Sequence, residues 1–158
     1  MGDVFNEQIV KRVPTLKDTI IKACIWVLVG VIGAASFVVL SHFAMLVVLG
    51  LFFGARFLIG YLNVEYEYAF TNGELDIDII YDQLRRKRVF SVNMRQIEAM
   101  AQLNDSKHAA AFGAAQERRD YSSGVHGADT YALVAVQGGR RILVIIEPNE
   151  KMLRALKR

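Results

Sequence analysis

The sequence is poor in residues that cross-link or interrupt a chain: it has one cysteine, Cys24, and two prolines, Pro14 and Pro148. A single cysteine excludes an internal disulfide and a cysteine-based zinc site, and Cys24 lies among apolar residues, where a free thiol acts as a small packing group. The sequence also lacks a Gly-x-Ser-x-Gly elbow, a phosphate-binding glycine loop and any His–Cys or paired-carboxylate arrangement with catalytic spacing. These absences argue against an enzyme, and no cofactor or metal is expected.

The segment between Lys22 and Arg56 contains no Asp, Glu, Lys or Arg. A membrane span needs about 20 apolar residues, and one helix over this run would be about 50 Å long against a hydrocarbon core of about 30 Å. Two shorter spans fit the core better, and the only adjacent polar pair in the run, Ser41-His42, lies near its middle. The run therefore predicts a two-helix membrane hairpin over residues 16–62, with spans at 16–40 and 43–62.

The ends of this hairpin carry recognisable signals. Thr15 and Asp18 form a helix-start pattern with Thr15 as the N-cap and Pro14 just outside the helix. Gly50 and Gly54 have the small-xxx-small spacing that lets membrane helices approach closely, although this spacing is also common by chance in spans rich in small residues. We therefore consider Gly50 and Gly54 candidate helix-packing residues.

Basic residues flank the two spans, and the turn between them contains none. Lys11, Arg12, Lys17 and Lys22 precede the first span, and Arg85, Arg86, Lys87 and Arg88 follow the second. By the positive-inside rule, the N- and C-termini are cytoplasmic in a multi-pass protein of the cell membrane. A cleaved secretory signal is the alternative, but the charged leader is long and the apolar run continues past Ala34–Ser36, where cleavage would fall.

Residues 1–15 form an N-terminal cytoplasmic segment in this interpretation. Val4, Phe5, Ile9 and Val13 recur at near-helical spacing with charged residues between them. This pattern is compatible with a short amphipathic helix on the inner leaflet or with a frayed terminus.

Residues 63–158 predict one small β-rich domain. Val64–Phe70 and Leu75–Ile79 alternate between apolar and acidic residues around Asn72-Gly73, which is a strong signal for a tight hairpin. A third strand at about 87–92 would place bases beside the acids of the second strand, and Ile97–Leu103 reads as a fourth. A second hairpin, Tyr131–Val136 and Arg141–Ile146, turns at Gly138-Gly139 and brings the strand count to six.

The remaining segments of the domain are a loop and a helix. Residues 104–130 are rich in Ala, Ser and Gly without apolar periodicity, which indicates a long mobile loop that is either functional or disordered. The composition is also compatible with a helical turn within this loop, around Ala109–Gln116. His108 and His126 lie in it without an acid or cysteine at ligand spacing, so a metal site is disfavoured. Residues 149–158 predict a C-terminal helix.

A meander of antiparallel strands followed by one amphipathic helix resembles a pleckstrin-homology-like (PH-like) barrel. Tyr66–Leu75 resembles the first hairpin of the bacterial versions, and Arg86–Val92 with Ile97–Met100 resembles their third and fourth strands. The whole chain is also similar to a family of small membrane proteins of Gram-positive bacteria to which no activity is assigned. The resemblance implies a transmembrane α-hairpin followed by a mainly-β PH-like antiparallel barrel with a C-terminal helix.

Two charged clusters are candidate sites. Asp76, Asp78 and Asp82 have part of the spacing of a calcium loop, but that motif needs glycine and glutamate where Tyr81 and Lys87 stand. The basic run Arg85–Arg88 is a candidate lipid-headgroup or topogenic patch, since bases near anionic lipid each contribute about 1 kcal/mol. In the competing interpretation, the acids of the neighbouring strand pair with at least Lys87 and Arg88.

Two classes of function follow from these observations. The first is a non-enzymatic, membrane-tethered interaction module that presents a PH-like domain at the inner leaflet to a protein or lipid partner. The second is a structural subunit of a larger membrane complex, which packs on partner helices through its glycines and can form a homo-oligomer. Lys/Arg and Asp/Glu are nearly balanced after residue 63, so no nucleic-acid partner is expected.

Overall fold

A computed structural model describes residues 5–157 of the chain. These residues divide into a helical unit, Pro14–Val64, and a β-rich unit made of the residues on either side of it.

The helical unit contains α1 (Leu16–Leu40), a 3-10 turn η1 (Ser41–Phe43) and α2 (Ala44–Gly60). The Thr15–Asp18 capping box forms as predicted, with the Thr15 N–H donating to the Asp18 carboxylate at 2.8 Å. η1 joins the helices, so Leu16–Gly60 is one helical stretch that folds back at Ser41, where φ is 42°. By length and composition alone this stretch is apolar enough to cross a membrane, with a mean hydropathy of 2.5 in its most apolar window.

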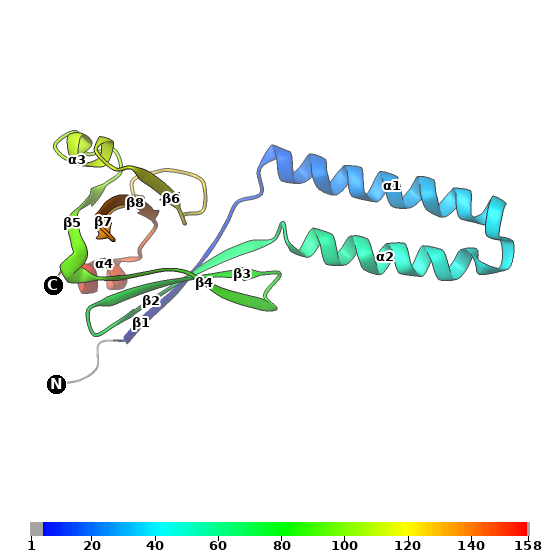
Figure 1. Cartoon of the computed structure of the whole chain (residues 1–158), viewed down its shortest axis with the longest axis horizontal. Helices are drawn as coiled ribbons and strands as arrows, with labels where there is room; N and C mark the ends of the chain where they lie inside the picture. Colours follow the sequence, from blue (N-terminus) through cyan, green and yellow to red (C-terminus); the bar gives the residue numbers. More distant parts are fainter. Residues whose placement is uncertain (1–4, 158) are drawn as a thin grey trace. The chain divides into compact units, whose positions relative to one another are not determined.

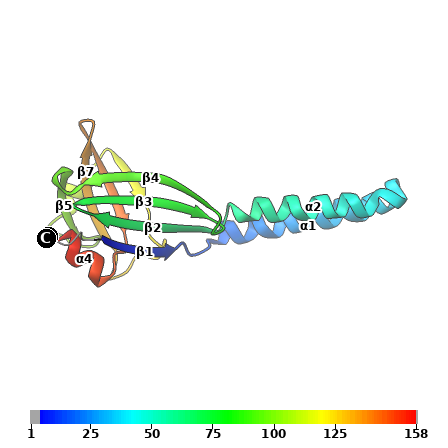
Figure 2. The same ribbon diagram turned by 90° about the horizontal axis from the view of Figure 1, so that it is seen from below.

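α1 and α2 lie side by side in both views (Figures 1 and 2). The Trp26 and Phe52 rings are 5.6 Å apart, and a Cβ on Gly33 would lie 3.4 Å from a methyl group of Val48. At the open end of the pair, Lys22 Nζ donates to Asn63 Oδ1 at 2.8 Å. The contacts between the two helices therefore include a tilted aromatic pair, one close approach at a glycine and one polar pair.

The β-rich unit contains two four-stranded sheets. Sheet A has the order β1-β2-β3-β4, made of β1 (Phe5–Lys11), β2 (Val64–Thr71), β3 (Glu74–Tyr81) and β4 (Arg85–Asn93). Sheet B has the order β5-β7-β8-β6, made of β5 (Ile97–Gln102), β7 (Tyr131–Gln137), β8 (Arg140–Ile146) and β6 (Glu117–Asp120). The predicted barrel is therefore not a closed one, and the structure has eight strands in its described part where the sequence indicated six.

The predicted hairpin β2–β3 forms around Asn72 and Gly73, whose φ angles of 49° and 85° are those of a type I′ turn. Tyr68, Phe70, Leu75 and Ile77 are buried as the alternation predicted. At the end of β3 the prediction is wrong, because Ile80 is buried and Ile79 is only partly buried. β4 pairs with β3 and places Arg88 opposite Asp78, which confirms the predicted third strand beside the acids.

The N-terminal segment is a strand and not the amphipathic helix that its spacing suggested. β1 pairs antiparallel with β2 from Phe5↔Thr71 to Lys11↔Glu65, and Val4 of the proposed helix lies outside the described residues. The Gln8 amide donates to the Glu147 carbonyl and accepts from the Asn149 N–H, both at 2.7 Å. Because these partners lie far along the sequence, local periodicity could not identify the strand.

The segment 104–130, predicted as a mobile loop with a helical turn around residues 109–116, contains a short helix at that place and a strand that was not predicted. α3 (Ala109–Gly113) precedes β6, which pairs in parallel with β8. Leu103, Phe112 and Ala115 pack on the apolar cluster of Ala132, Val134 and Leu143 in sheet B. Because these three side chains cover one face of sheet B, consecutive residues of β7 are buried on both faces of the strand. β6 has only four residues, Glu117–Asp120, which is too short to produce a periodic sequence signal.

The η2 turn (Met94–Gln96) connects β4 to β5, and α4 (Glu150–Leu156) closes the chain. Asn149 caps α4 by accepting the Met152 N–H at 2.8 Å, which gives the predicted C-terminal helix slightly narrower bounds than 149–158. Met152 and Leu156 of α4 are buried, and in sheet B Leu133, Val144, Ile145 and Ile146 are fully buried.

Candidate functional site

The basic run predicted as a lipid patch begins at the tight turn between β3 and β4. Asp82 and Gln83 both adopt left-handed backbone conformations, with φ of 50° and 59°. Leu84 closes the turn by donating its N–H to the Tyr81 carbonyl at 3.0 Å, and the residue is 83% exposed. The turn thus presents an apolar side chain directly before Arg85–Arg88.

A β-bulge decides which bases share a face. Ile77 lies opposite Phe90, whereas the next residue, Asp78, lies opposite Arg88, so Val89 is an extra residue in β4. Side chains alternate between faces along a strand, and an extra residue reverses that alternation. The face of sheet A that carries Glu74, Asp76 and Asp78 is its acidic face. Ser91 of β4 lies on this face and donates to Glu74. Beyond the bulge, Arg86 and Arg88 lie on the acidic face in place of Lys87.

The bulge therefore sets the ion pairs of sheet A. Arg88 lies between Asp76 and Asp78, at 2.8 and 2.9 Å from their carboxylates, and Arg86 is ion-paired with Glu67. The sequence correctly indicated that neighbouring acids engage Arg88, but it assigned Lys87 where the structure uses Arg86. Lys87 alternates to the opposite face together with Arg85.

Glu67 is the most perturbed carboxyl of this face. Its side chain is 3% exposed, because Arg86 and neighbouring strands cover it. Burial is the largest cause that raises the pKa of Glu67, and a side-chain hydrogen bond with Glu7 also raises it, while Arg86 lowers it. The net pKa is about 7. A buried carboxyl destabilises the fold when it ionises, because the carboxylate loses its hydration. The Glu67 carboxylate therefore depends on the neighbouring Arg86 cation to offset this cost.

The basic turn lies at the end of sheet A that is covalently joined to the helical unit. Gln83 donates to Glu65 at 3.3 Å, and Lys11 lies 3.4 Å from the same Glu65 carboxylate. The chain leaves the sheet after Lys11 towards α1 and returns to it after α2. Both connections are thus at the end of the sheet that carries Leu84.

A groove of about 640 Å³ runs beside the edge strand β1. One wall is Gln8–Lys11, and the other is formed by Tyr131, Glu147–Glu150 and Leu153. Ile9, on the first wall, is 53% exposed. An edge strand next to a groove of mixed polarity has the geometry in which an extended peptide can bind.

The two candidate packing glycines do not mediate the contact between α1 and α2. A Cβ at Gly50 or Gly54 would meet no atom within 4 Å, unlike one at Gly33. Both glycines instead line an apolar groove of about 480 Å³ together with Ile25, Leu28 and Ile32 of α1. At both glycines the surface of the helix pair is therefore hollowed.

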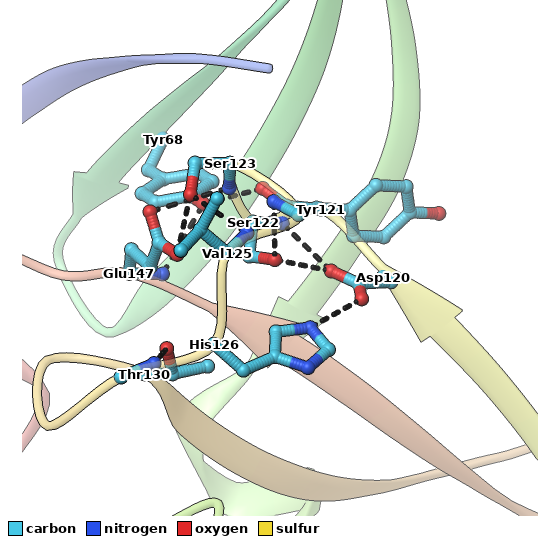
Figure 3. A network of polar contacts seen from close by, with 11 residues as sticks. Tyr68, Asp120, Tyr121, Ser122, Ser123, Val125, His126, Thr130 and Glu147 are labelled. Carbon is cyan, nitrogen blue, oxygen red and sulfur yellow. Dashed lines mark hydrogen bonds and ion pairs between the residues drawn. The ribbon is translucent and has the colours of Figure 1, made fainter. Parts of the chain in front are cut away.

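A polar network fixes the segment that follows β6 (Figure 3). The buried Tyr68 hydroxyl donates to the Tyr121 carbonyl at 2.5 Å and accepts the Glu147 N–H at 3.3 Å. The Glu147 carboxylate accepts from the Ser123 hydroxyl and N–H at 2.8 and 3.2 Å. Ser122 is likewise bonded to Asp120. This part of the predicted mobile loop is therefore anchored to both sheets.

The histidines of this segment form local pairs with acids. His108 Nδ1 lies 2.9 Å from Asp105, and His126 Nε2 lies 2.8 Å from Asp120. Burial raises the pKa of Asp120, but hydrogen bonds from Ser122 and His126 outweigh it, and the net shift is downward. Within residues 5–157 no cluster of three or more His, Cys, Asp or Glu side chains has the arrangement of a metal site.

Comparison with protein families gives one match, over almost the whole chain. The model of a family described as Bacterial PH-like domain (DUF6106) matches residues 2–158. Neither curated proteins nor solved structures gave a match. PH-like domains are generally non-catalytic binding modules, and no enzyme family is indicated.

Proposed function

The chain belongs to the bacterial PH-like domain family (DUF6106), and from this we propose that it is a membrane-tethered interaction module. In this proposal α1 and α2 span the cell membrane, both termini are cytoplasmic, and the β-rich unit is presented at the inner leaflet to a protein partner. Its contact with that partner is the groove beside β1.

The exposure of the apolar helices is the observation that carries this proposal. In the most apolar window of Leu16–Gly60 only 11% of residues are buried, and large side chains such as Val31, Phe37 and Phe53 are more than half exposed. The core helix of a soluble protein buries such side chains against its own domain, whereas a lipid-facing helix leaves them outward. The basic residues before α1 and after α2 support the cytoplasmic placement of both termini.

Cysteine labelling in intact cells tests the tether. In a Cys24→Ser background, His42→Cys should react with a membrane-impermeant maleimide added outside the cell, because residue 42 lies in the turn between the two spans. Val125→Cys, which is 62% exposed in the β-rich unit, should react only after permeabilisation. Labelling of position 125 from outside, or of neither position before permeabilisation, would contradict the proposed topology.

A second function, as a subunit of a membrane complex, is supported by the groove at Gly50 and Gly54. Glycines that face outward from a helix pair allow a third helix to approach closely. This groove contains almost no polar surface, so its natural occupant in lipid is another apolar helix, either from a partner or from a second copy of the chain.

Co-purification after crosslinking in cells distinguishes the two functions. If the β1 groove binds the partner, Ile9→Asn should reduce recovery of the crosslinked partner severalfold, while Gly50→Leu with Gly54→Leu should leave it unchanged. The opposite result would assign the partner to the membrane groove. Gly30→Leu is the matched control, since its Cβ would also meet open space but it does not line the groove.

A further inference from the structure

We propose that the groove between Asn6 of β1 and the exposed face of α4 binds an acidic, extended segment of the protein partner. This inference rests on the proposed function, which places that partner in the groove beside β1. It adds a further part of the contact surface and the chemistry of the peptide that this part selects.

The first observation is a buried polar group without a partner. Asn6 is 6% exposed, and its Oδ1 atom has no hydrogen-bond partner among the described residues. Buried polar atoms almost always have such a partner, so an unsatisfied one calls for an explanation. Asn6 lines a groove of about 730 Å³, and the last side-chain torsion of asparagine is soft enough to turn Oδ1 towards it. A ligand with an N–H group would supply the missing hydrogen bond.

The second observation is the positive charge of the α4 side of this groove. Lys151, Arg154 and Lys157 line it together with one acid, Glu150. Glu150 is paired with Arg154 at 2.9 Å, but the two side chains are 87% and 80% exposed, and an ion pair this exposed is weak. Lys157 Nζ lies 5.4 Å from the centre of the Tyr131 ring, and within residues 5–157 Lys151 is in no ion pair. The groove therefore favours an anionic ligand.

The third observation is that this groove adjoins the groove beside β1. Glu150 and Leu153 line both of them, and β1 borders them from Asn6 to Lys11. A peptide extended along this part of β1 would span about 20 Å. A free phosphate fills only the end at Asn6, whereas a peptide supplies a backbone N–H for Oδ1 and carboxylates for the bases of α4. An acidic peptide is therefore the occupant that matches both features.

The test uses the full chain in detergent and a phage-displayed library of random linear peptides. Peptides selected by the unaltered chain are expected to be rich in Asp and Glu. Lys151→Glu with Arg154→Glu reverses the charge of the groove, so selection by this variant should enrich Lys and Arg instead. Lys107→Glu with Arg140→Glu makes the same change of charge at exposed positions outside the groove and should preserve the acidic enrichment.

Asn6→Leu separates recognition from stability. Leucine is similar in size to asparagine and removes the unsatisfied Oδ1 atom, so resistance to urea should be unchanged or higher. The affinity for a selected acidic peptide, measured by fluorescence anisotropy, should nevertheless fall severalfold. The charge reversal on α4 should lower the same affinity by about an order of magnitude. Because both reversed positions are exposed, that variant decides the question even if Asn6→Leu fails to fold.

Selected peptides without acidic enrichment, or acidic peptides whose binding survives the charge reversal, would overturn the inference. If such peptides still lost affinity with Ile9→Asn, the β1 contact of the proposed function would stand without it. Binding of inorganic phosphate or of soluble short-chain phosphatidylglycerol as tightly as the acidic peptide would assign the groove to a free anion or to lipid and would also overturn it. A selection without any binding peptide would contradict the inference and the β1 contact together, and the cysteine labelling would still decide the tether.

Discussion

Arg86→Ala is expected to destabilise the β-rich unit by about 3 kcal/mol at about pH 8 and by less than about 1 kcal/mol at about pH 5. Without the guanidinium, the buried Glu67 carboxylate has the Glu7 and Asp78 carboxyls as neighbours and has lost its cation. At the lower pH Glu67 is protonated, and the missing cation matters little. Pulse proteolysis of the full chain in detergent, across a urea series at both pH values, measures this difference.

The direction of this pH dependence follows from the raised pKa. The pKa of Glu67 is about 7 in the fold against 4.5 for an ordinary glutamate, so the folded state binds its proton more tightly. The resulting stability is fully present below the ordinary pKa and is lost as the pH rises through the folded value. Glu67→Gln should flatten this dependence and rescue Arg86→Ala at the higher pH. A loss of equal size at both pH values, without rescue, would contradict this account.

Tyr68→Phe is expected to cost about 2–4 kcal/mol of unfolding free energy, a large effect for the loss of one oxygen atom. The Tyr68 hydroxyl is bonded to the Tyr121 carbonyl and the Glu147 N–H, and the residue is fully buried. Phenylalanine preserves the packing but leaves both backbone groups without this partner. The urea series used for Arg86→Ala measures the loss.

Hydrogen exchange of peptides covering residues 121–130 locates the effect. Exchange there should accelerate more than in α4, because Tyr68 and Glu147 together hold this segment. Tyr131→Phe keeps the ring that packs under Lys157 and should change stability by less than about 0.5 kcal/mol. If Tyr68→Phe matched this control, the network would be incidental to the fold.

This network changes the functional interpretation of the chain. The sequence indicates that residues 104–130 are a mobile loop, and a loop of this length that is functional is a candidate surface for recruiting a partner. The structure has α3 packed on sheet B and residues 121–123 bonded to Tyr68 and Glu147. The groove beside β1 is therefore the stronger candidate for the contact.

Local sequence patterns identified most of the elements. Strict alternation and Asn72-Gly73 were sufficient for the hairpin β2–β3, and the Thr15–Asp18 pattern was sufficient for the start of α1. These signals succeed because each depends on residues within a few positions of one another. The resemblance to bacterial PH-like domains then agreed with the family match over residues 2–158.

The patterns failed where the deciding partner lies far along the chain. β1 is a strand because β2 and the segment 147–149 bond to it, and β6 forms by pairing with β8. Two separate sheets in place of a closed barrel likewise depend on which strands pair, and local alternation does not specify that.

The apolar run between Lys22 and Arg56 was sufficient, by itself, to determine a long apolar helical stretch, because the composition of a segment dictates which solvent its side chains tolerate. The sequence also placed acids and bases on neighbouring strands. Only the tertiary structure decided which charges meet: the extra residue Val89 turns Arg86 and Arg88 towards the acids and Lys87 away from them. It also decided that Gly50 and Gly54 line an open groove. Both outcomes depend on side-chain direction in the folded chain, which one residue of register can reverse.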